Sequence, residues 1–327
     1  MFVNFLILLV LLVLTVGASW LTWRAARAQR LWVKIAGGLG AGLLTLVFAA
    51  LTFFGGKGVA TVYFPGTSPA SDLTVTGTAE QIARGQYLMN ISCANCHSAP
   101  GPDGMPGGGP LLSGGANLTA AEGFGFVGDI ITENLTPNGK LANYSDGELF
   151  RALRHNVTQE GRRMIAMSFM PYNHLSDEDI QAIIAYIRTL PPATNEGVTG
   201  DHLNFIGLLL VGAGLFGESQ PPAPDSIVAP EPGFTAQYGE YVATFGECRG
   251  CHGPNMTGKA ASMILPEVPN ARPFASTLSQ EQFTILMRTG IKPDGTAFPP
   301  NMPWYNASKM TDDDLAALYA YLSAPVK

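Results

Sequence analysis

The feature that most constrains this chain is a five-residue pattern, Cys-x-x-Cys-His, which occurs once in "ISCANCHSAP" and once as "CRGCH". Together the two copies contain every cysteine of the 327-residue chain. The residues of the pattern are Cys93, Cys96, His97, Cys248, Cys251 and His252. A cysteine pair that is followed both times by histidine predicts covalent or metal chemistry at two separate places.

The pattern matches the attachment site of c-type haem. Within one helical turn the two thiols face the same side, where both can form thioethers with the haem vinyl groups, and the next histidine can bind the iron. A zinc site needs four ligands, whereas each copy offers three and the copies lie about 150 residues apart. A redox-active cysteine pair or a structural disulfide gives no reason for the repeated histidine. We therefore predict two covalently bound haem c groups.

A Met-Pro pair follows each copy and predicts the second axial ligand of each iron. The surrounding stretches align as an internal repeat: "RGQYLMNISCANCH" with "YGEYVATFGECRGCH", and "FRALRHNVTQEGRRMIAMSFMPY" with "FTILMRTGIKPDGTAFPPNMPWY". A methionine thioether suits haem iron, and the neighbouring proline restricts the backbone that aims it. We predict Met170 and Met302 as these ligands. The alternatives are Met164, Met167 and His174 in the first copy and Met256, Met263 and Met310 in the second.

Each copy predicts a small domain of helices, and no alternation typical of strands stands out. Its opening helix leads into the cysteine pattern, and a middle and a closing helix follow, each with Ser or Thr at the N-cap and an acidic or amide residue three positions later. The opening helices are predicted at about 80–92 and 236–245. The middle helices are predicted to begin at Ser145 and near Ser279, and the closing helices at Ser176 and Thr311. The Gly/Pro-rich stretch 98–115 predicts an irregular loop.

Both halves resemble class I cytochrome c domains, over about 79–193 and 233–327. In that family the last helix packs against a pair of one glycine and one aromatic residue in the first helix. Gly85 with Tyr87, and Gly239 with Tyr241, fit that pair, and Tyr186 and Tyr319 or Tyr321 fit the facing positions of the last helix. The stretch "NLTPNGKLANYSDGELFRALRHNV" and the closing-helix sequence "MPYNHLSDEDIQAIIAYIRTLPP" resemble the cytochrome subunits of membrane-bound sugar and alcohol dehydrogenases. Those subunits usually carry three haems, whereas this chain offers two and a long hydrophobic N-terminus. The resemblance implies haem attachment outside the bacterial cytoplasmic membrane.

The first 57 residues predict a hairpin of two transmembrane helices. Residues 2–23 and 35–54 carry no charge, and each run is long enough to cross a bilayer. Between them lie four basic residues and no acidic one, which places this loop in the cytoplasm and the rest of the chain on the periplasmic side. A cleaved signal peptide is the alternative for the first run, but the basic segment that such a peptide begins with is missing.

The predicted organisation is therefore all-α, with an anchor followed by two haem domains. Its parts are a hairpin (1–57), a linker (58–78), a first cytochrome c domain (79–193), a linker with an apolar segment (194–232) and a second cytochrome c domain (233–327). The apolar segment, "FIGLLLVGAGLFG" at 205–217, is too short to cross a membrane. We expect it to lie on the membrane surface or against a partner subunit; a buried interdomain helix is the alternative.

Charge and ligands together predict electron transfer. All 25 acidic residues lie beyond residue 57, whereas five of the 19 basic residues lie within the first 57 residues, so the external part is acidic. Such a surface favours a basic redox partner, and nucleic-acid binding is not expected. We predict a di-haem carrier of single electrons, without enzymatic activity of its own, in a respiratory or photosynthetic membrane complex. The alternatives are a haem-bearing subunit of a terminal oxidase or membrane dehydrogenase, and a di-haem peroxidase, which would need one iron with an open coordination position.

Overall fold

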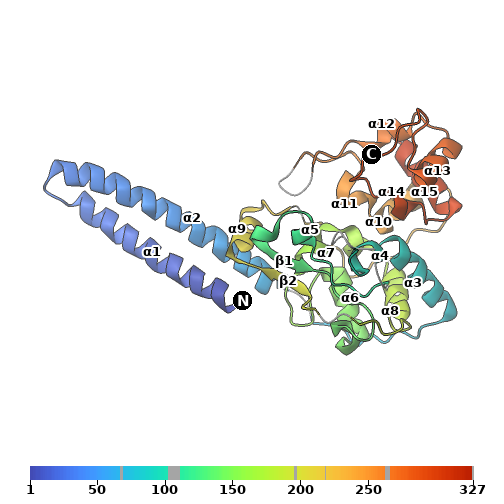
Figure 1. The fold of residues 1–327 in the computed structure, drawn as a ribbon, viewed down its shortest axis with the longest axis horizontal. Helices are drawn as coiled ribbons and strands as arrows, with labels where there is room; N and C mark the ends of the chain where they lie inside the picture. Colours follow the sequence, from blue (N-terminus) through green and yellow to red (C-terminus); the bar gives the residue numbers. More distant parts are fainter. Residues whose placement is uncertain (67–68, 102–110, 195–196, 218, 262–265, 326–327) are drawn as a thin grey trace.

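The computed structural model describes residues 1–66, 69–101, 111–194, 197–217, 219–261 and 266–325. It shows a long helical arm and two helical domains that pack against each other (Figure 1). Part of the Gly/Pro-rich loop predicted at 98–115, residues 102–110, lies outside the described residues.

The arm is an antiparallel pair of helices, α1 (Phe2–Ala26) and α2 (Gly38–Tyr63), joined through a short π-helix, η1 (Val33–Gly37). Both helices are long and apolar enough to cross a membrane. Two hydroxyl pairs join them, Thr15 with Thr52 and Thr22 with Thr45, each at 3.1 Å between the oxygens. Helix α2 continues to Tyr63, so it includes the first residues of the linker predicted at 58–78.

The first domain is mostly helical and follows the predicted order of opening, middle and closing helices. Its main helices are α3, α6 and α8, and each begins with a serine or threonine side chain that accepts a hydrogen bond from the third helical residue. Its elements are α3 (Ala79–Ile91), α4 (Ala94–His97), α5 (Leu118–Ala121), η2 (Gly125–Val127), β1 (Gly128–Ile131), η3 (Lys140–Asn143), α6 (Asp146–His155), α7 (Ile165–Phe169), η4 (Pro171–His174) and α8 (Asp177–Ile187).

The second domain repeats this order with α10, α13 and α15 in the places of α3, α6 and α8. The same N-caps recur at Thr235, Ser279 and Thr311. Its elements are α10 (Ala236–Phe245), α11 (Cys248–His252), α12 (Ala271–Ala275), α13 (Gln280–Thr289), α14 (Trp304–Ala307) and α15 (Asp312–Ser323).

In both domains the opening helix crosses the closing helix at a glycine. A Cβ atom at Gly85 would lie 1.9 Å from the Ala182 carbonyl oxygen and 2.9 Å from Tyr186 Cβ. At Gly239 it would lie 1.8 Å from the Ala317 carbonyl oxygen and 2.8 Å from Tyr321 Cβ. The close crossing of each domain therefore requires glycine.

We expect Gly85→Ala to destabilise the first domain by about 2–3 kcal/mol, since a methyl group there overpacks two helix backbones that cannot separate locally. Thermal unfolding followed by circular dichroism measures this loss. Gly125→Ala is the matched control, because a Cβ atom there meets nothing within 4 Å. An unchanged midpoint for Gly85→Ala would show that the crossing relaxes without cost.

The prediction of purely helical domains missed one small sheet. Strand β1 pairs antiparallel with β2 (Gly200–Leu203), in a register that places Asp129 opposite His202. Four-residue strands carry too little alternation to stand out in a sequence, and β2 lies in the segment predicted as a linker. Its pairing fixes the start of α9 (Phe205–Ala213) beside the first domain.

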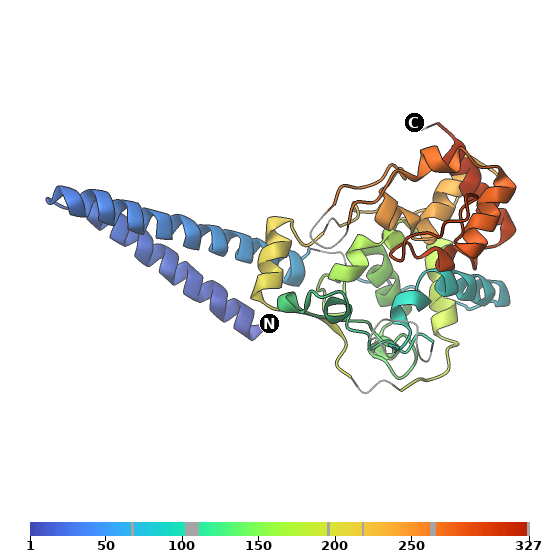
Figure 2. The same ribbon diagram turned by 45° about the horizontal axis from the view of Figure 1, so that its top comes forward.

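The apolar segment 205–217 has a packing partner in its own chain, contrary to our expectation. Helix α9 lies across the end of α2 (Figure 2, α9 in yellow). The Leu208 carbonyl oxygen lies where a Cβ atom of Gly58 would be, and the Phe54 carbonyl oxygen lies where one of Gly212 would be. Two small residues thus allow the two backbones to touch. Ile206 and Leu215 remain half exposed on the outer side.

Candidate haem-binding sites

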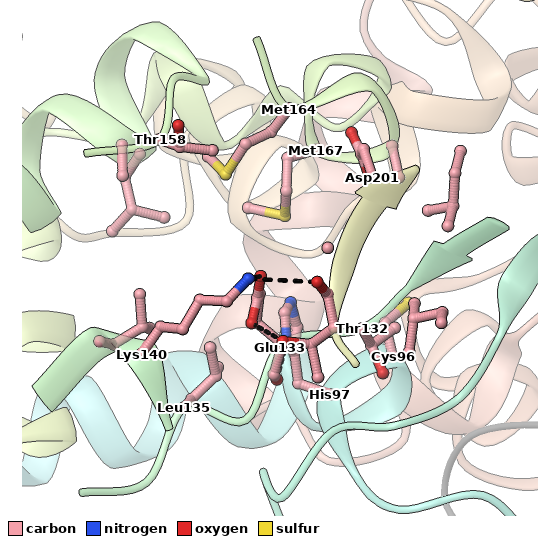
Figure 3. Close-up of a pocket in the computed structure, with 18 of the residues that line it drawn as sticks. Cys96, His97, Thr132, Glu133, Leu135, Lys140, Thr158, Met164, Met167 and Asp201 are labelled. Carbon is pink, nitrogen blue, oxygen red and sulfur yellow. Dashed lines mark hydrogen bonds and ion pairs between the residues drawn. The ribbon is translucent and has the colours of Figure 1, made fainter. Parts of the chain in front are cut away.

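The first cysteine pattern lies in a short helical turn, α4, directly after the opening helix. Cys93, Cys96 and His97 line one cavity, and α7 lies on its opposite side. Figure 3 shows Met164 and Met167 projecting from that opposite side toward the cavity that His97 enters from below. The structure thus brings together the predicted attachment residues of the first copy and several candidate sulfur ligands.

Both pattern histidines are held in the orientation that iron ligation requires. His97 Nδ1 lies 2.8 Å from the carbonyl oxygen of Glu133, and His252 Nδ1 lies 2.9 Å from that of Pro269. Since a carbonyl can only accept, Nδ1 carries the hydrogen and donates it. The other ring nitrogen, Nε2, is then unprotonated and available to a metal. Burial also lowers the pKa of both imidazoles, which keeps them neutral.

The four cysteines are free thiols, which is the state that haem attachment starts from. All four are free of disulfides, and burial raises the pKa of Cys93 and Cys248, so their thiols stay protonated. Over the described part of the chain, no group of three or more His, Cys, Asp or Glu side chains is arranged to hold a metal ion. A neutral thiol pair beside one histidine suits thioether formation with haem and lacks the thiolate set of a zinc site.

The remaining lining of the first cavity also fits a haem. Its walls are mainly apolar side chains, among them Leu135, Leu149 and Ile183. Arg163 lines the same cavity, and its Nε atom is buried without a hydrogen-bond partner. A haem has an apolar macrocycle and anionic propionates, so an apolar slot with an unpaired guanidinium nitrogen matches both parts.

The two closing helices fix which residues of the two ligand loops are equivalent. Arg154 of α6 donates to the carbonyl oxygen of Asn173 at 2.6 Å and to Asp177 at 2.7 Å. Arg288 of α13 makes the same pair of bonds, to the carbonyl oxygen of Ser308 and, at 2.7 Å, to Asp312. Asn173 therefore corresponds to Ser308, and the first residues of α8 and α15 correspond as well.

This register places Met167, and not Met170, opposite Met302 in the repeat. Met167 precedes the N-cap Ser176 by nine residues, and Met302 precedes the N-cap Thr311 by the same nine. Met170 lines the first cavity, but its Sδ atom lies 3.3 Å from the position that a Cβ atom of Gly250 would take. It thus packs against the cysteine pattern of the other domain. Met170 stays a prediction, and the register favours Met167.

In the second domain, α11 carries Cys248, Cys251 and His252, and Met302 lies just before α14. The Met302 amide donates to the carbonyl oxygen of Pro299, and its carbonyl accepts from the amide of Trp304. These bonds form a tight turn around the Met-Pro pair. The Trp304 indole packs against Gly290, where a Cβ atom would lie 2.3 Å from the ring. The loop that carries Met302 is therefore braced against the middle helix.

The two segments that carry the cysteine patterns are in contact, which was not predicted. Ser92 Oγ, next to Cys93, donates to the Phe245 carbonyl oxygen at 2.5 Å. The Tyr172 hydroxyl donates to the carboxylate of Glu247, which directly precedes Cys248. Burial raises the pKa of Glu247 to about 8. No local pattern signals such a contact, because it depends on how the two domains pack.

Comparison with known proteins agrees with the site geometry. The sequence model of the cytochrome c family matches residues 82–191 and 236–324. The fructose dehydrogenase cytochrome subunit of Gluconobacter japonicus is 32% identical over 125 residues, which cover 37% of this chain and 24% of the relative. A diheme cytochrome c-type protein of Cereibacter sphaeroides is 26% identical over 75% of this chain and 86% of its own length.

A third relative is the cytochrome c subunit of the alcohol dehydrogenase (quinone) of Gluconacetobacter polyoxogenes, 30% identical over 130 residues. This alignment covers 36% of the present chain and 26% of the relative. The chain therefore spans about a quarter of the length of the dehydrogenase subunits that it matches and most of the length of the diheme protein. Both matched segments contain one complete cysteine pattern and one methionine-bearing loop, and the chain belongs to the cytochrome c family.

Proposed function

We propose that this chain is a membrane-anchored di-haem cytochrome c that carries single electrons between redox proteins on the periplasmic side of the bacterial membrane. The observation that supports this most directly is the equivalence of the two domains. Each has a cysteine pair, a histidine with Nε2 available and a methionine nine residues before the N-cap of the closing helix. Two complete sites of one kind suit a relay of electrons between two haems.

The chain's own residues define how each haem would be held. Cys93 with Cys96, and Cys248 with Cys251, would form the thioethers, and His97 and His252 would bind the iron from one side. We propose Met167 and Met302 on the other side, with Met164 and Met170 as alternatives in the first domain. When bound, the haem iron supplies the one-electron chemistry. The protein contributes ligation, exclusion of water and positive charge from Arg163 for a propionate.

The methionine that each domain offers to its iron argues against the alternative of a di-haem peroxidase. That chemistry needs an iron with a position open to peroxide, whereas each domain here offers a methionine that closes it. The matched dehydrogenase subunits support a role as the electron-accepting subunit of a membrane dehydrogenase-type complex. A haem subunit of a terminal oxidase differs in partner and keeps the same electron-transfer role.

A redox titration of the purified protein tests the proposal. We expect two reversible one-electron steps per chain, a ratio of two covalent haems per polypeptide, and no peroxide turnover. Visible spectra recorded against electrode potential measure the steps, and the pyridine haemochrome measures the haem content. A single step, or rapid binding of cyanide or carbon monoxide by one haem, would contradict two methionine-ligated sites.

We expect the anchor to place Gln220 and the C-terminus on the periplasmic side. The two apolar helices of the arm return the chain to the side from which it started, and the basic loop between them favours the cytoplasm. Cysteine-free reporter fusions at Gln220 and at Lys327 measure the topology. Helix α9 has nine residues, too few to cross, so a cytoplasmic signal at Gln220 would contradict this arrangement.

A further inference from the structure

The two domains exchange tyrosines in a pseudo-two-fold arrangement. Tyr87 lies two residues after the crossing glycine of α3, and Tyr241 lies two residues after that of α10. Neither hydroxyl bonds the closing helix of its own domain. The hydroxyl of each one reaches the first turn of the closing helix in the other domain.

The hydrogen bonds on the two sides match. Tyr241 accepts from the Ser176 amide at 2.9 Å and donates to Asp179 at 2.6 Å. Tyr87 accepts from the Thr311 amide at 3.0 Å and donates to Asp314. Each hydroxyl thus satisfies the N-cap amide and the third-residue carboxylate of the partner helix. Tyr–carboxylate bonds of this kind are stronger than neutral ones.

Each carboxylate is also held from within its own domain, by the residue just before the crossing glycine. Arg84 binds Asp179 through two bonds of 2.8 Å, and Tyr238 donates to Asp314 at 3.1 Å. The aspartates are buried, so their oxygens need these partners. Removing an interdomain tyrosine hydroxyl would leave a buried helix amide and a carboxylate oxygen short of one partner.

The same interface brings the two haem attachment segments into contact. Ser92, immediately before Cys93, donates to the Phe245 carbonyl oxygen, and the Tyr172 hydroxyl lies within 3.3 Å of the Ser92 carbonyl oxygen and bonds Glu247, immediately before Cys248. Phe245 lies between the exchanged rings, with centroids 6.4 Å from Tyr87 and 5.7 Å from Tyr241. Lys309 adds a bond to the Asn90 carbonyl oxygen at 3.0 Å. The arrangement that the tyrosines fix is therefore one in which the thioether-bearing segments of the two domains touch.

We propose that Tyr87 and Tyr241 are positioning residues that hold the two haem domains as one pair, so that electrons pass directly between the haems within a single molecule. The inference rests on the proposed function and adds the path by which an electron passes between the two haems. In the step, one electron leaves the ferrous haem of one domain and reduces the ferric haem of the other. No bond forms or breaks, and no further oxidant or reductant takes part.

The test compares the full-length wild type with Tyr87→Glu/Tyr241→Glu, in which each new carboxylate faces Asp314 or Asp179. Like charges confined in a buried interface shift the docking equilibrium by about a hundredfold or more. After photoreduction of one haem, we expect electron exchange between the haems to be independent of protein concentration in the wild type. In the double variant, the same exchange should fall to a small fraction of that rate. Tyr305→Glu adds the same charge at a side chain that is 43% exposed and makes none of the tyrosine–aspartate bonds, and it should leave the electron exchange unchanged.

A second variant keeps the test independent of folding. Tyr87→Phe/Tyr241→Phe keeps both rings and removes only the hydroxyls, with Tyr319→Phe, whose hydroxyl bonds Leu278 within one domain, as its control. We expect the Ser176 and Thr311 amides to lose hydrogen-exchange protection by about tenfold or more, together with slower electron exchange, in this variant alone.

Wild-type electron exchange in a glutamate variant that keeps both haems would overturn the proposal, and so would an equal loss in Tyr305→Glu. If the glutamate variant loses haem, the phenylalanine variant decides, and unchanged amide protection in it overturns the proposal. Wild-type protein whose haems titrate normally but exchange electrons only between molecules would also overturn it, while the proposed function would stand.

Discussion

Replacing Met167 with histidine is expected to remove about half of the sulfur-to-iron band near the red edge of the visible spectrum of the oxidised protein. It should also lower one haem potential by on the order of 0.1 V, because axial ligands move haem potentials over a total range of about 0.8 V. The loss is expected because Met167 takes the place of Met302 in the register that Arg154 and Arg288 fix. Spectroelectrochemistry measures both changes, and the other haem reports on the fold.

Met170→His is the matched control for this experiment. Its sulfur lies beside Gly250, so the substitution should disturb the domain interface and leave both sulfur-to-iron bonds in place. The opposite pattern, with the band halved in Met170→His and intact in Met167→His, would establish Met170 as the ligand. Loss of the band in Met164→His alone would select the third candidate.

Most of the fold was predictable because its determinants are local. N-cap pairs such as Ser145 with Glu148 predict where the helices begin, and the structure contains the corresponding capping hydrogen bonds. The crossing of first and last helices follows from Gly85 and Gly239, which leave room for backbone contact. The cytochrome c family model matches two segments, 82–191 and 236–324, and each contains one of the two cysteine patterns.

In the first domain, two signals in the sequence favour different methionines as the iron ligand. The Met-Pro pair at Met170 repeats the Met-Pro pair at Met302, but it lies three residues closer to the N-cap of its closing helix. Counting back from the N-caps Ser176 and Thr311 gives the other register, and that count needs only the sequence. The spacing to the N-cap therefore favours Met167, whereas the Met-Pro pair favours Met170.

The domain interface could not be predicted, since nothing local encodes it. Tyr87 and Tyr241 read as ordinary members of the family's glycine and aromatic pair, yet their hydroxyls lie in the other domain. The packing of α9 on α2 was missed for a similar reason. The glycines that permit it, Gly58 and Gly212, lie about 150 residues apart and gain their meaning only when the two helices meet.

Removing both thiols of the second site, Cys248→Ala with Cys251→Ala, is expected to leave one covalent haem per chain in place of two. In the proposed ligation, thioethers to these thiols would be the permanent links to the haem, and without them His252 and Met302 would have to hold it by coordination alone. Since a group that binds only the folded state stabilises it, α10 to α15 should lose stability together when the haem is lost. The pyridine haemochrome after acid–acetone extraction measures the haem count. Met256→Leu, a buried substitution in the same domain that keeps its volume and both thiols, should retain two haems. The chain has no cysteine outside the two patterns. Two covalent haems in the double-alanine variant would therefore contradict attachment of the second haem through Cys248 and Cys251.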